Sequence, residues 1–338
     1  MTEIFKRETI FEAADVLREG GIVAFPTETV YGLGAAANNQ KAVERVFEVK
    51  GRPQDNPLIV HVDHPDTVKQ FVEVGAEVQQ LIDTFWPGPL TVIFPYEGDA
   101  FSPSISAGQP TVSFRMPDNA DTLALIEAVG FPLVGPSANK SGKPSPTSLE
   151  HVLHDFDGEI EGVLESSEPA FDIGVESTVI YPIESEIVIL RPGAITKQML
   201  EVVTDLPVYE KTAKDQLSGK QAVYSPGVKY THYSPKQPVY MVSYGTSLER
   251  VAEWIKTKQG RIGLLADNDW LTDFEEVAAT YSLGEAGDIQ SATRELYAGL
   301  RYLEQQDIDV ILVQGFDENE ENAHAVMNRL SKASNFVI

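Results

Sequence analysis

Cysteine is absent from this chain of 338 residues. Without a thiol the protein can form no disulfide, no thiolate metal site and no cysteine nucleophile. Long apolar runs are missing too, since no stretch reaches the roughly eighteen consecutive apolar residues that a membrane-spanning helix requires. The N-terminus lacks the basic start, apolar core and small-residue cleavage site of a secretory signal. These absences predict a cytoplasmic protein without a membrane partner.

Basic residues are scarce. Lysine and arginine number 26 against 51 aspartates and glutamates, which gives a formal net charge of −25. A surface that neutralised many phosphates would need a basic face, and the overall field of this chain repels polyanions. Stable binding to nucleic acid is therefore not expected, whereas a local cationic pocket for a single nucleotide is compatible with this charge.

Several well-known ligand motifs are also missing. The chain has no G-x-x-x-x-G-K-[ST] phosphate loop and no G-x-S-x-G elbow. GLGAAA at 32–37 matches G-x-G-x-x-A, but residues 27–31 separate it from the preceding strand and no helix opens at once. We interpret Gly32 and Gly34 as turn formers that allow close packing. The histidine pairs at 61/64 and 151/154 lack the H-E-x-x-H spacing, so no metal site is expected.

The length favours two domains, because single cores rarely grow to this size. Residues 1–209 interleave helices and strands, with several strands in succession, which predicts a mixed, partly antiparallel sheet. Residues 210–238 read as a linker. Residues 239–338 alternate strands with helices expected at 248–258, 270–279, 292–305 and 322–334. That alternation predicts a smaller, Rossmann-like doubly wound domain.

A few cations and polar loops stand out within the first region. Lys50 and Arg52 follow a helix expected over 41–49, Arg115 ends the strand TVSFR, and GPSAN at 135–139 follows another strand. These groups suit phosphate or carboxylate binding. Ordinary structure explains them equally well: basic residues favour helix C-termini, arginines form surface ion pairs, and small polar residues make turns. Spacing alone does not decide between these interpretations.

Taken together, several motifs resemble threonylcarbamoyl-AMP synthases of the Sua5/YrdC/YciO group. They are PTETVYGLG (26–34), KGRPQDNPLIVHV (50–62), WPGPLT (86–91), TVSFRMP (111–117), GPSANKSGKPSPT (135–147), GVESTVI (174–180), LRPGAIT (190–196) and SPGVKYTHYSP (225–235). They cover most of residues 5–235 in the family's order. The region after the SPG-x-K-Y-x-H-Y segment resembles the additional domain of the Sua5 subgroup. The implied fold is a YrdC-like twisted mixed sheet followed by that domain.

The resemblance implies an ATP-dependent activity. L-Threonine and bicarbonate form N-carboxy-threonine, whose carboxylate attacks the α-phosphate of ATP, and pyrophosphate leaves. The product, L-threonylcarbamoyl-adenylate, would pass to downstream tRNA threonylcarbamoyl transferase proteins that modify adenosine 37 of tRNA. Mg²⁺ is expected to accompany ATP, held largely by phosphate oxygens and water. No covalent nucleophile and no tightly bound organic cofactor are implied, so catalysis would rest on positioning and charge stabilisation.

The resemblance also implies two groups of site residues. Lys50, Arg52 and Arg115 are the expected catalytic cations. Positions implied to contact ATP are Lys50, Arg52, Asn56, Thr111, Ser137, Ser145, Arg191 and His232. Positions implied to contact threonine are Thr29, His61, Arg115, Gly135 and Ser177. The linker is expected to act as a lid, with His232 and the neighbouring Tyr230 and Tyr233 closing over the nucleotide.

Two other functions remain open at this point. YrdC-like folds can present a concave basic surface, so an RNA-binding module is the main alternative, and the net charge of −25 weighs against it. A carbamoyl transferase whose YrdC-like domain adenylates a different carbamate is the other. Such proteins carry zinc-finger parts, and this chain has no cysteine to build one.

Overall fold

The structure is a computed structural model that describes residues 1–167, 172–211 and 233–338. Internal contacts divide the chain into two units. Unit 1 comprises Met1–Ser141 and the described parts of 146–171 and 176–230. Unit 2 comprises Gly142–Ser145, Asp172–Val175 and the described residues from 233 onward. Two short segments that precede residue 176 thus belong to the same compact unit as the C-terminal region.

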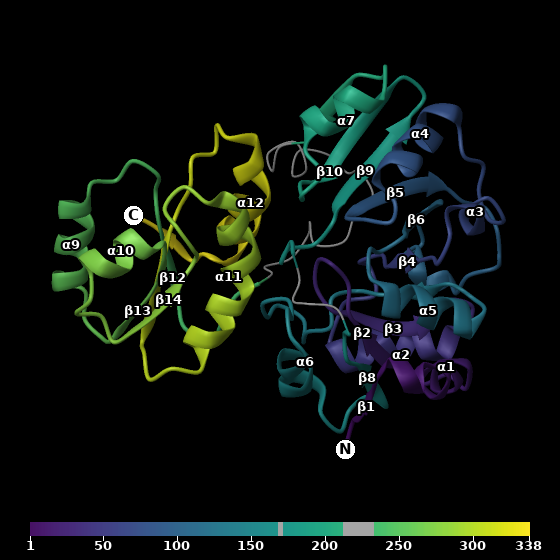
Figure 1. Cartoon of the computed structure of the whole chain (residues 1–338), viewed down its shortest axis with the longest axis horizontal. Helices are drawn as coiled ribbons and strands as arrows, with labels where there is room; N and C mark the ends of the chain where they lie inside the picture. The colour runs from purple at the N-terminus through teal and green to yellow at the C-terminus, as the bar shows by residue number, and fades with distance from the viewer. Residues whose placement is uncertain (168–171, 212–232) are drawn as a thin grey trace. The chain divides into compact units, whose positions relative to one another are not determined.

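The described strands of unit 1 form one 11-stranded sheet in the order β1-β8-β2-β3-β7-β4-β6-β5-β9-β10-β11 (Figure 1). In chain order they are β1 (Glu3–Phe5), β2 (Val23–Phe25), β3 (Gly32–Ala36), β4 (Ile59–His61), β5 (Leu90–Pro95), β6 (Thr111–Arg115), β7 (Leu133–Val134), β8 (Gly162–Leu164), β9 (Thr178–Ile183), β10 (Glu186–Arg191) and β11 (Val208–Glu210). Parallel pairs such as β4 with β6 stand beside antiparallel pairs such as β5 with β6. The predicted mixed sheet is confirmed. The strand β11 extends into the first residue of the predicted linker.

The helices of unit 1 are α1 (Ile10–Arg18), α2 (Gln40–Lys50), α3 (Pro65–Val68), α4 (Ala76–Phe85), α5 (Ala120–Val129), α6 (Leu149–Phe156) and α7 (Lys197–Val203), with 3-10 turns η1 (Arg7–Thr9) and η2 (Pro103–Ile105). The helix α2 positions part of the site, and its ends are set by sequence. The Asn39 side chain accepts a hydrogen bond from the Ala42 amide, and Gly51 ends the helix at a φ of 62°. Lys50 is therefore the last residue of α2.

Gly32 and Gly34 lie in the strand β3, so their interpretation as turn formers is wrong. The strand β3 pairs antiparallel with β2, with Phe25 opposite Gly32. A Cβ atom on Gly32 would lie 2.7 Å from the Phe25 ring, and one on Gly34 would lie 2.5 Å from the Val23 carbonyl oxygen. These glycines therefore make room for a neighbouring strand and its aromatic ring.

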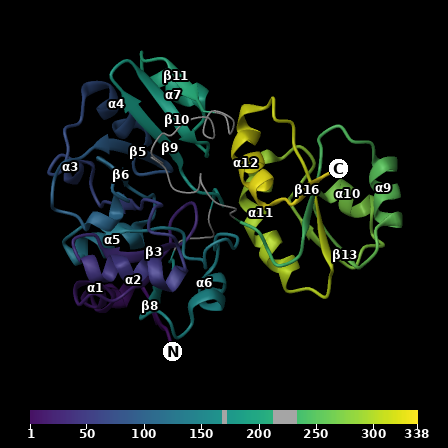
Figure 2. The same cartoon turned by 180° about the vertical axis from the view of Figure 1, so that it is seen from behind.

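Unit 2 contains a five-stranded sheet in the order β14-β13-β15-β12-β16, with every pair parallel. Its strands are β12 (Val239–Val242), β13 (Ile262–Ala266), β14 (Ala279–Ser282), β15 (Val310–Gln314) and β16 (Phe336–Val337). Its helices are α9 (Leu248–Thr257), α10 (Asn268–Asp273), α11 (Ile289–Glu304) and α12 (His324–Ala333), with the 3-10 turn η3 (Glu321–Ala323). Figures 1 and 2 show α9 and α10 on one face and α11 and α12 on the other. The predicted doubly wound fold is confirmed.

The helix expected at 270–279 begins and ends earlier. The Asp267 side chain accepts a hydrogen bond from the Trp270 amide, so α10 begins at Asn268. The helix ends at Asp273, and Ala279 already belongs to β14, which pairs with β13. Among the helices that the structure describes, none is long and apolar enough to cross a bilayer.

Candidate functional site

The first cluster of predicted residues lies where β4 and β6 end. These strands run parallel, with His61 opposite Arg115. Both side chains are buried. The Arg115 Nε donates to the Gly88 carbonyl at 3.3 Å, and the His61 ring meets the Phe25 ring edge-on at a centroid distance of 5.4 Å. The parallel pairing therefore brings together two residues that are 54 positions apart in the sequence.

Arg115 is paired with a carboxylate that the sequence analysis missed. Its Nη2 lies 2.7 Å from Oε2 of Glu28, and the two side chains are only 5% and 9% exposed. The same Glu28 oxygen accepts a hydrogen bond from the Asp118 amide at 3.1 Å. Its other oxygen, Oε1, is buried without a hydrogen-bond partner among the described residues. Glu28 shows that this guanidinium can hold a carboxylate in a buried setting. Its position between two threonines of the PTETVYGLG motif was the available signal.

Thr29 lies beside Glu28 in a short hydroxyl network. The Thr27 hydroxyl donates to the Val30 carbonyl at 2.7 Å and lies 2.8 Å from the Thr29 hydroxyl. A threonine has one hydroxyl proton, so Thr29 must donate to Thr27 in this arrangement. The Thr29 oxygen then keeps lone pairs that can accept from a ligand.

His61 is held neutral. Burial and the adjacent Arg115 guanidinium lower the pKa of His61 to about 3, because both disfavour the charged ring. Its Nδ1 is buried without a hydrogen-bond partner among the described residues. Gly135 lies against the ring, and a Cβ atom there would be 2.8 Å from His61 Nδ1. The absence of a side chain at Gly135 therefore leaves the ring its place.

A second cluster joins Ser177, Arg191 and Thr91. Arg191 donates from Nε to the Ser177 carbonyl at 3.0 Å and from Nη2 to the Ser177 hydroxyl at 3.1 Å. The hydroxyls of Thr91 and Ser177 are 2.8 Å apart. All three residues are buried. The structure thus brings together one residue implied to contact ATP and one implied to contact threonine.

A third cluster surrounds the end of α2. The buried Lys50 ammonium donates to the carbonyls of Ser137 and Asn139, the latter at 2.6 Å. Arg52 donates to the carbonyls of Asn56 and Pro57 at 3.4 and 3.1 Å. Lys50 and Arg52 therefore each tie a loop to the helix end: Lys50 the GPSAN loop, and Arg52 the loop that leads to β4.

Asn56 is the clearest open group of this cluster. Its side chain is part of a residue only 1% exposed, and neither Oδ1 nor Nδ2 has a hydrogen-bond partner among the described residues. Buried amide groups are almost always hydrogen-bonded, so an amide without partners indicates a missing ligand or water. An amide offers a donor and an acceptor side by side, which suits a nucleobase edge or a ribose hydroxyl.

Three predicted residues lie apart from these clusters or beyond the described residues. Thr111 is the first residue of β6 and Arg115 the last, so they lie about 13 Å apart along the strand. Ser145 is buried and belongs to unit 2. His232 lies outside the described residues, as does Tyr230. Tyr233 is described, and its ring packs on Tyr297 at 5.2 Å within unit 2.

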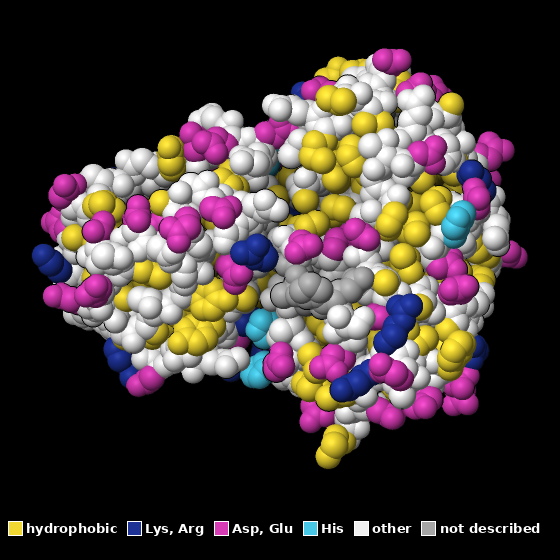
Figure 3. All heavy atoms as spheres, viewed as in Figure 1, with side chains coloured by type: hydrophobic (Ala, Val, Ile, Leu, Met, Phe, Trp, Pro, Cys, Tyr) yellow, Lys and Arg dark blue, Asp and Glu magenta, His cyan; other side chains and the backbone are white. Residues whose placement is uncertain are grey.

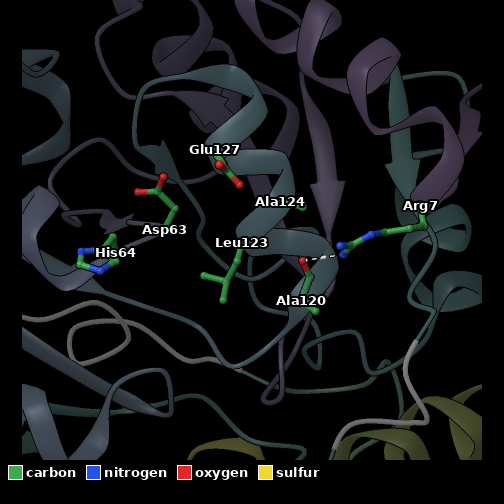
Figure 4. A pocket seen from close by; sticks show the side chains of 7 residues that line it. All are labelled: Arg7, Asp63, His64, Ala120, Leu123, Ala124 and Glu127. Carbon is green, nitrogen blue, oxygen red and sulfur yellow. Dashed lines mark hydrogen bonds between the residues drawn. The ribbon is translucent and has the colours of Figure 1, made fainter.

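Within the described part of the chain, no group of three or more histidine and carboxylate side chains is placed to hold a metal ion. A separate hollow of about 450 Å³ opens beside α5, lined by Arg7, Asp63, His64, Ala120, Leu123, Ala124 and Glu127. Figure 4 shows these side chains around the exposed side of α5, with Arg7 hydrogen-bonded to the Ala120 carbonyl. None of the predicted site residues lines it, so it is distinct from the clusters described above.

Comparisons with known proteins cover nearly the whole chain. A family model described as "Telomere recombination" (Sua5_yciO_yrdC) matches residues 15–193, and one described as "Threonylcarbamoyl-AMP synthase, C-terminal domain" matches residues 195–335. The threonylcarbamoyl-AMP synthase of Bacillus subtilis is 42% identical over 335 residues, which covers 96% of this chain and 92% of that protein. The one from Pyrococcus abyssi is 39% identical, with coverage of 96% and 94%. The crystal structure of P. abyssi Sua5 complexed with L-threonine superposes with a TM-score of 0.89 at 36% identity, covering 100% and 99% of the two chains.

Proposed function

Because the chain belongs to the Sua5 family of threonylcarbamoyl-AMP synthases, we propose that Arg115 binds the α-carboxylate of L-threonine during the synthesis of L-threonylcarbamoyl-adenylate. This activity is the first step in forming threonylcarbamoyl-adenosine in tRNA, and the enzyme is a nucleotidyltransferase. One observation supports the proposal most strongly: Arg115 already holds a buried carboxylate, that of Glu28, at 2.7 Å. The solved P. abyssi relative is described as a complex with L-threonine.

The residues around Arg115 provide for the rest of the amino acid. Threonine carries an ammonium, a hydroxyl and a carboxylate. The Thr29 oxygen has lone pairs for the amino group, and the neutral His61 ring offers Nδ1 without adding a second positive charge beside Arg115. Gly135, which packs against the His61 ring, is proposed to border the same amino acid. Ser177, held by Arg191, is proposed to border the same amino acid.

The nucleotide half of the site is proposed to form around Lys50, Arg52 and Asn56. In the reaction, the threonine nitrogen takes up bicarbonate carbon with loss of water to give a carbamate. A carbamate oxygen attacks the α-phosphorus of ATP, the bond to the β-phosphate oxygen breaks, and pyrophosphate leaves with that electron pair. Lys50 and Arg52, which both lie at the end of α2, are proposed to stabilise this charge, and Asn56 is proposed to supply its amide to the nucleotide. Thr111, Ser137, Ser145, Arg191 and His232 are proposed as further nucleotide contacts.

Magnesium is proposed to arrive as part of the MgATP substrate. The described residues offer no carboxylate cluster for a resident ion, and Mg²⁺ commonly binds through phosphate oxygens and water. The adenylate is proposed to pass to a tRNA threonylcarbamoyl transferase. Direct RNA binding has less support, since the chain carries a net charge of −25 and acidic side chains are scattered over the face shown in Figure 3.

The test is pyrophosphate release by the full chain with ATP, threonine and bicarbonate. We expect release to require both threonine and bicarbonate, and mass spectrometry to find threonylcarbamoyl-adenylate. Pyrophosphate release that continues unchanged without threonine would contradict the proposed function. Tight, salt-resistant tRNA binding in the absence of ATP would support the RNA-binding alternative.

A further inference from the structure

The helix α11 lies with α12 on one face of the sheet of unit 2 (Figure 1). It is 16 residues long, and its inner face carries Leu296, Leu300 and Leu303, all fully buried. The two early segments that belong to unit 2, Gly142–Ser145 and Asp172–Val175, each contact this helix. Both segments lead directly into residues of the proposed site.

The first segment is held by Arg301 of α11. This arginine is only 2% exposed, and it donates from Nε and Nη2 to the carbonyl oxygen of Pro144 at 3.0 and 2.6 Å. That carbonyl belongs to the peptide bond that joins Pro144 to Ser145. Hydrogen bonds from a charged donor are among the stronger ones in proteins. A buried guanidinium therefore fixes the peptide group next to a proposed ATP contact.

The same segment is also held at its other end. The Ser234 amide donates to the Gly142 carbonyl at 2.8 Å, and the Ser234 hydroxyl donates to the Ala333 carbonyl at the end of α12 at 3.2 Å. Three hydrogen bonds from the C-terminal region thus hold a segment of four residues. Such a density of bonds leaves Gly142–Ser145 little freedom apart from the helices of unit 2.

The second segment meets α11 at Arg294. Gly174 has a φ of 76°, and a Cβ atom on it would lie 2.3 Å from the Arg294 carbonyl oxygen and 2.4 Å from its Cα. Only glycine fits both the backbone conformation and this approach. Gly174 stands three residues before Ser177. Arg294 and Arg301 are seven residues apart, so the two contacts lie about 10 Å apart, two turns along one helix.

We propose that α11 is a positioning element for the adenylation reaction: Arg301 holds the segment that carries Ser145, and the Gly174 contact holds the segment that leads to Ser177. A helix keeps its length, so it fixes the spacing between these two segments. This assigns α11 a positioning role for segments that carry or precede proposed substrate contacts. The inference rests on the proposed function for the identities of the two substrates.

The main test is a split between the Michaelis constants of the two substrates in the full-length enzyme. Arg301→Leu should raise the KM for ATP about tenfold and change the KM for threonine less than twofold, because it releases the Pro144 carbonyl. Gly174→Ala should do the reverse, raising the KM for threonine about tenfold. Arg301→Lys keeps one donor for the carbonyl and should recover part of the loss. It also decides the matter if Arg301→Leu does not fold.

The matched control is Tyr281→Phe. It removes a hydrogen bond of 2.9 Å from the Tyr281 hydroxyl in β14 to Glu295 of α11, and it keeps Arg301 and Gly174 unchanged. It should lower the melting temperature and leave both KM values within twofold of the wild type. The proposal is overturned if the Arg301 variants raise both KM values equally, or only lower the melting temperature.

Failure of this inference can be separated from failure of the proposed function. Binding of a non-hydrolysable ATP analogue, measured by calorimetry without threonine, does not depend on the reaction. Arg301→Leu should weaken it about tenfold, and unchanged binding would overturn the role of Arg301. A wild-type enzyme that binds the analogue but releases no pyrophosphate with threonine would instead contradict the proposed function.

Discussion

The two units differ in how buried polar groups near their strands are hydrogen-bonded. In unit 1, Asn56 and His61 have buried polar atoms without hydrogen-bond partners among the described residues. In unit 2, Asp267 follows β13 and Gln314 ends β15, at the carboxyl ends of two neighbouring parallel strands. These two residues satisfy each other: the Asp267 amide donates to Gln314 Oε1, and Gln314 Nε2 donates to Asp267 Oδ2, both at 2.8 Å.

This contrast identifies where a ligand is needed. Doubly wound sheets ordinarily bind ligands at the carboxyl ends of strands, where the chain direction reverses. In unit 2 the side chains of Asp267 and Gln314 already occupy that position and bond to each other. A buried polar group without a partner costs about 1–3 kcal/mol, so unit 1 carries a cost that a bound substrate would offset. The doubly wound fold, which is the one most suggestive of nucleotide binding, therefore has its strand-end pair Asp267 and Gln314 hydrogen-bonded to each other, whereas Asn56 and His61 of the mixed-sheet unit have polar atoms without partners among the described residues.

The largest effect should come from Arg115. Arg115→Met removes the proposed partner of the threonine carboxylate, and we expect kcat/KM for threonine to fall about 100-fold, which corresponds to about 2.7 kcal/mol. The KM for ATP should stay within threefold. Lys50→Ala should do the reverse and impair the use of ATP more than the use of threonine. The measurement is initial-rate pyrophosphate release with each substrate varied in turn.

Because Arg115→Met leaves Glu28 buried without its cation, the double variant Arg115→Met/Glu28→Gln is the control for folding. It should recover stability while threonine use stays lost. If the Arg115 and Lys50 variants lost activity equally for both substrates, the assignment of Arg115 to threonine and Lys50 to ATP would be contradicted.

A matched pair of substitutions tests the contrast between the units directly. Asn56→Leu replaces an amide without partners by an apolar side chain of similar size, so the ligand-free protein should be as stable as the wild type or more stable. Its affinity for ATP should fall about tenfold. Gln314→Leu should do the opposite: it leaves the Asp267 amide and one carboxylate oxygen, Oδ2, without these hydrogen bonds, lowering the free energy of unfolding by about 1–3 kcal/mol.

Calorimetric melting without ligand and titration with ATP measure both quantities. Gln314→Leu should bind ATP within twofold of the wild type. If Asn56→Leu destabilised the ligand-free protein as much as Gln314→Leu does, the amide of Asn56 would be a structural group, and the contrast between the units would disappear.

The sequence predicts what local signals determine. The helix expected over 41–49 is found as α2, and the alternation after residue 238 predicts the parallel sheet of unit 2. Gly32 and Gly34 look like turn residues although they lie in a strand, because the need for glycine comes from the Phe25 ring and the Val23 carbonyl of the paired strand β2. The site shows the same limit. Lys50 and Arg52 stand together in the chain, whereas Glu28 and Arg115 are 87 positions apart and meet only in the folded protein.

The smallest effect we predict is a pH dependence of stability from His61. Its pKa is about 3 in the folded protein because of burial and Arg115, against about 6.5 in an unfolded chain. Below pH 6.5 the unfolded state takes up a proton that the folded state does not, so stability falls as the pH falls towards 3. Between pH 6 and pH 5 this group should lower the free energy of unfolding by about 1 kcal/mol.

His61→Asn should remove that part of the pH-dependent difference in the free energy of unfolding, measured with a denaturant. His154→Asn, which removes an exposed imidazole, should keep it. A wild-type difference that persists in His61→Asn would mean that the ring gains its proton within the folded protein, and the neutral imidazole proposed beside the threonine site would then be wrong.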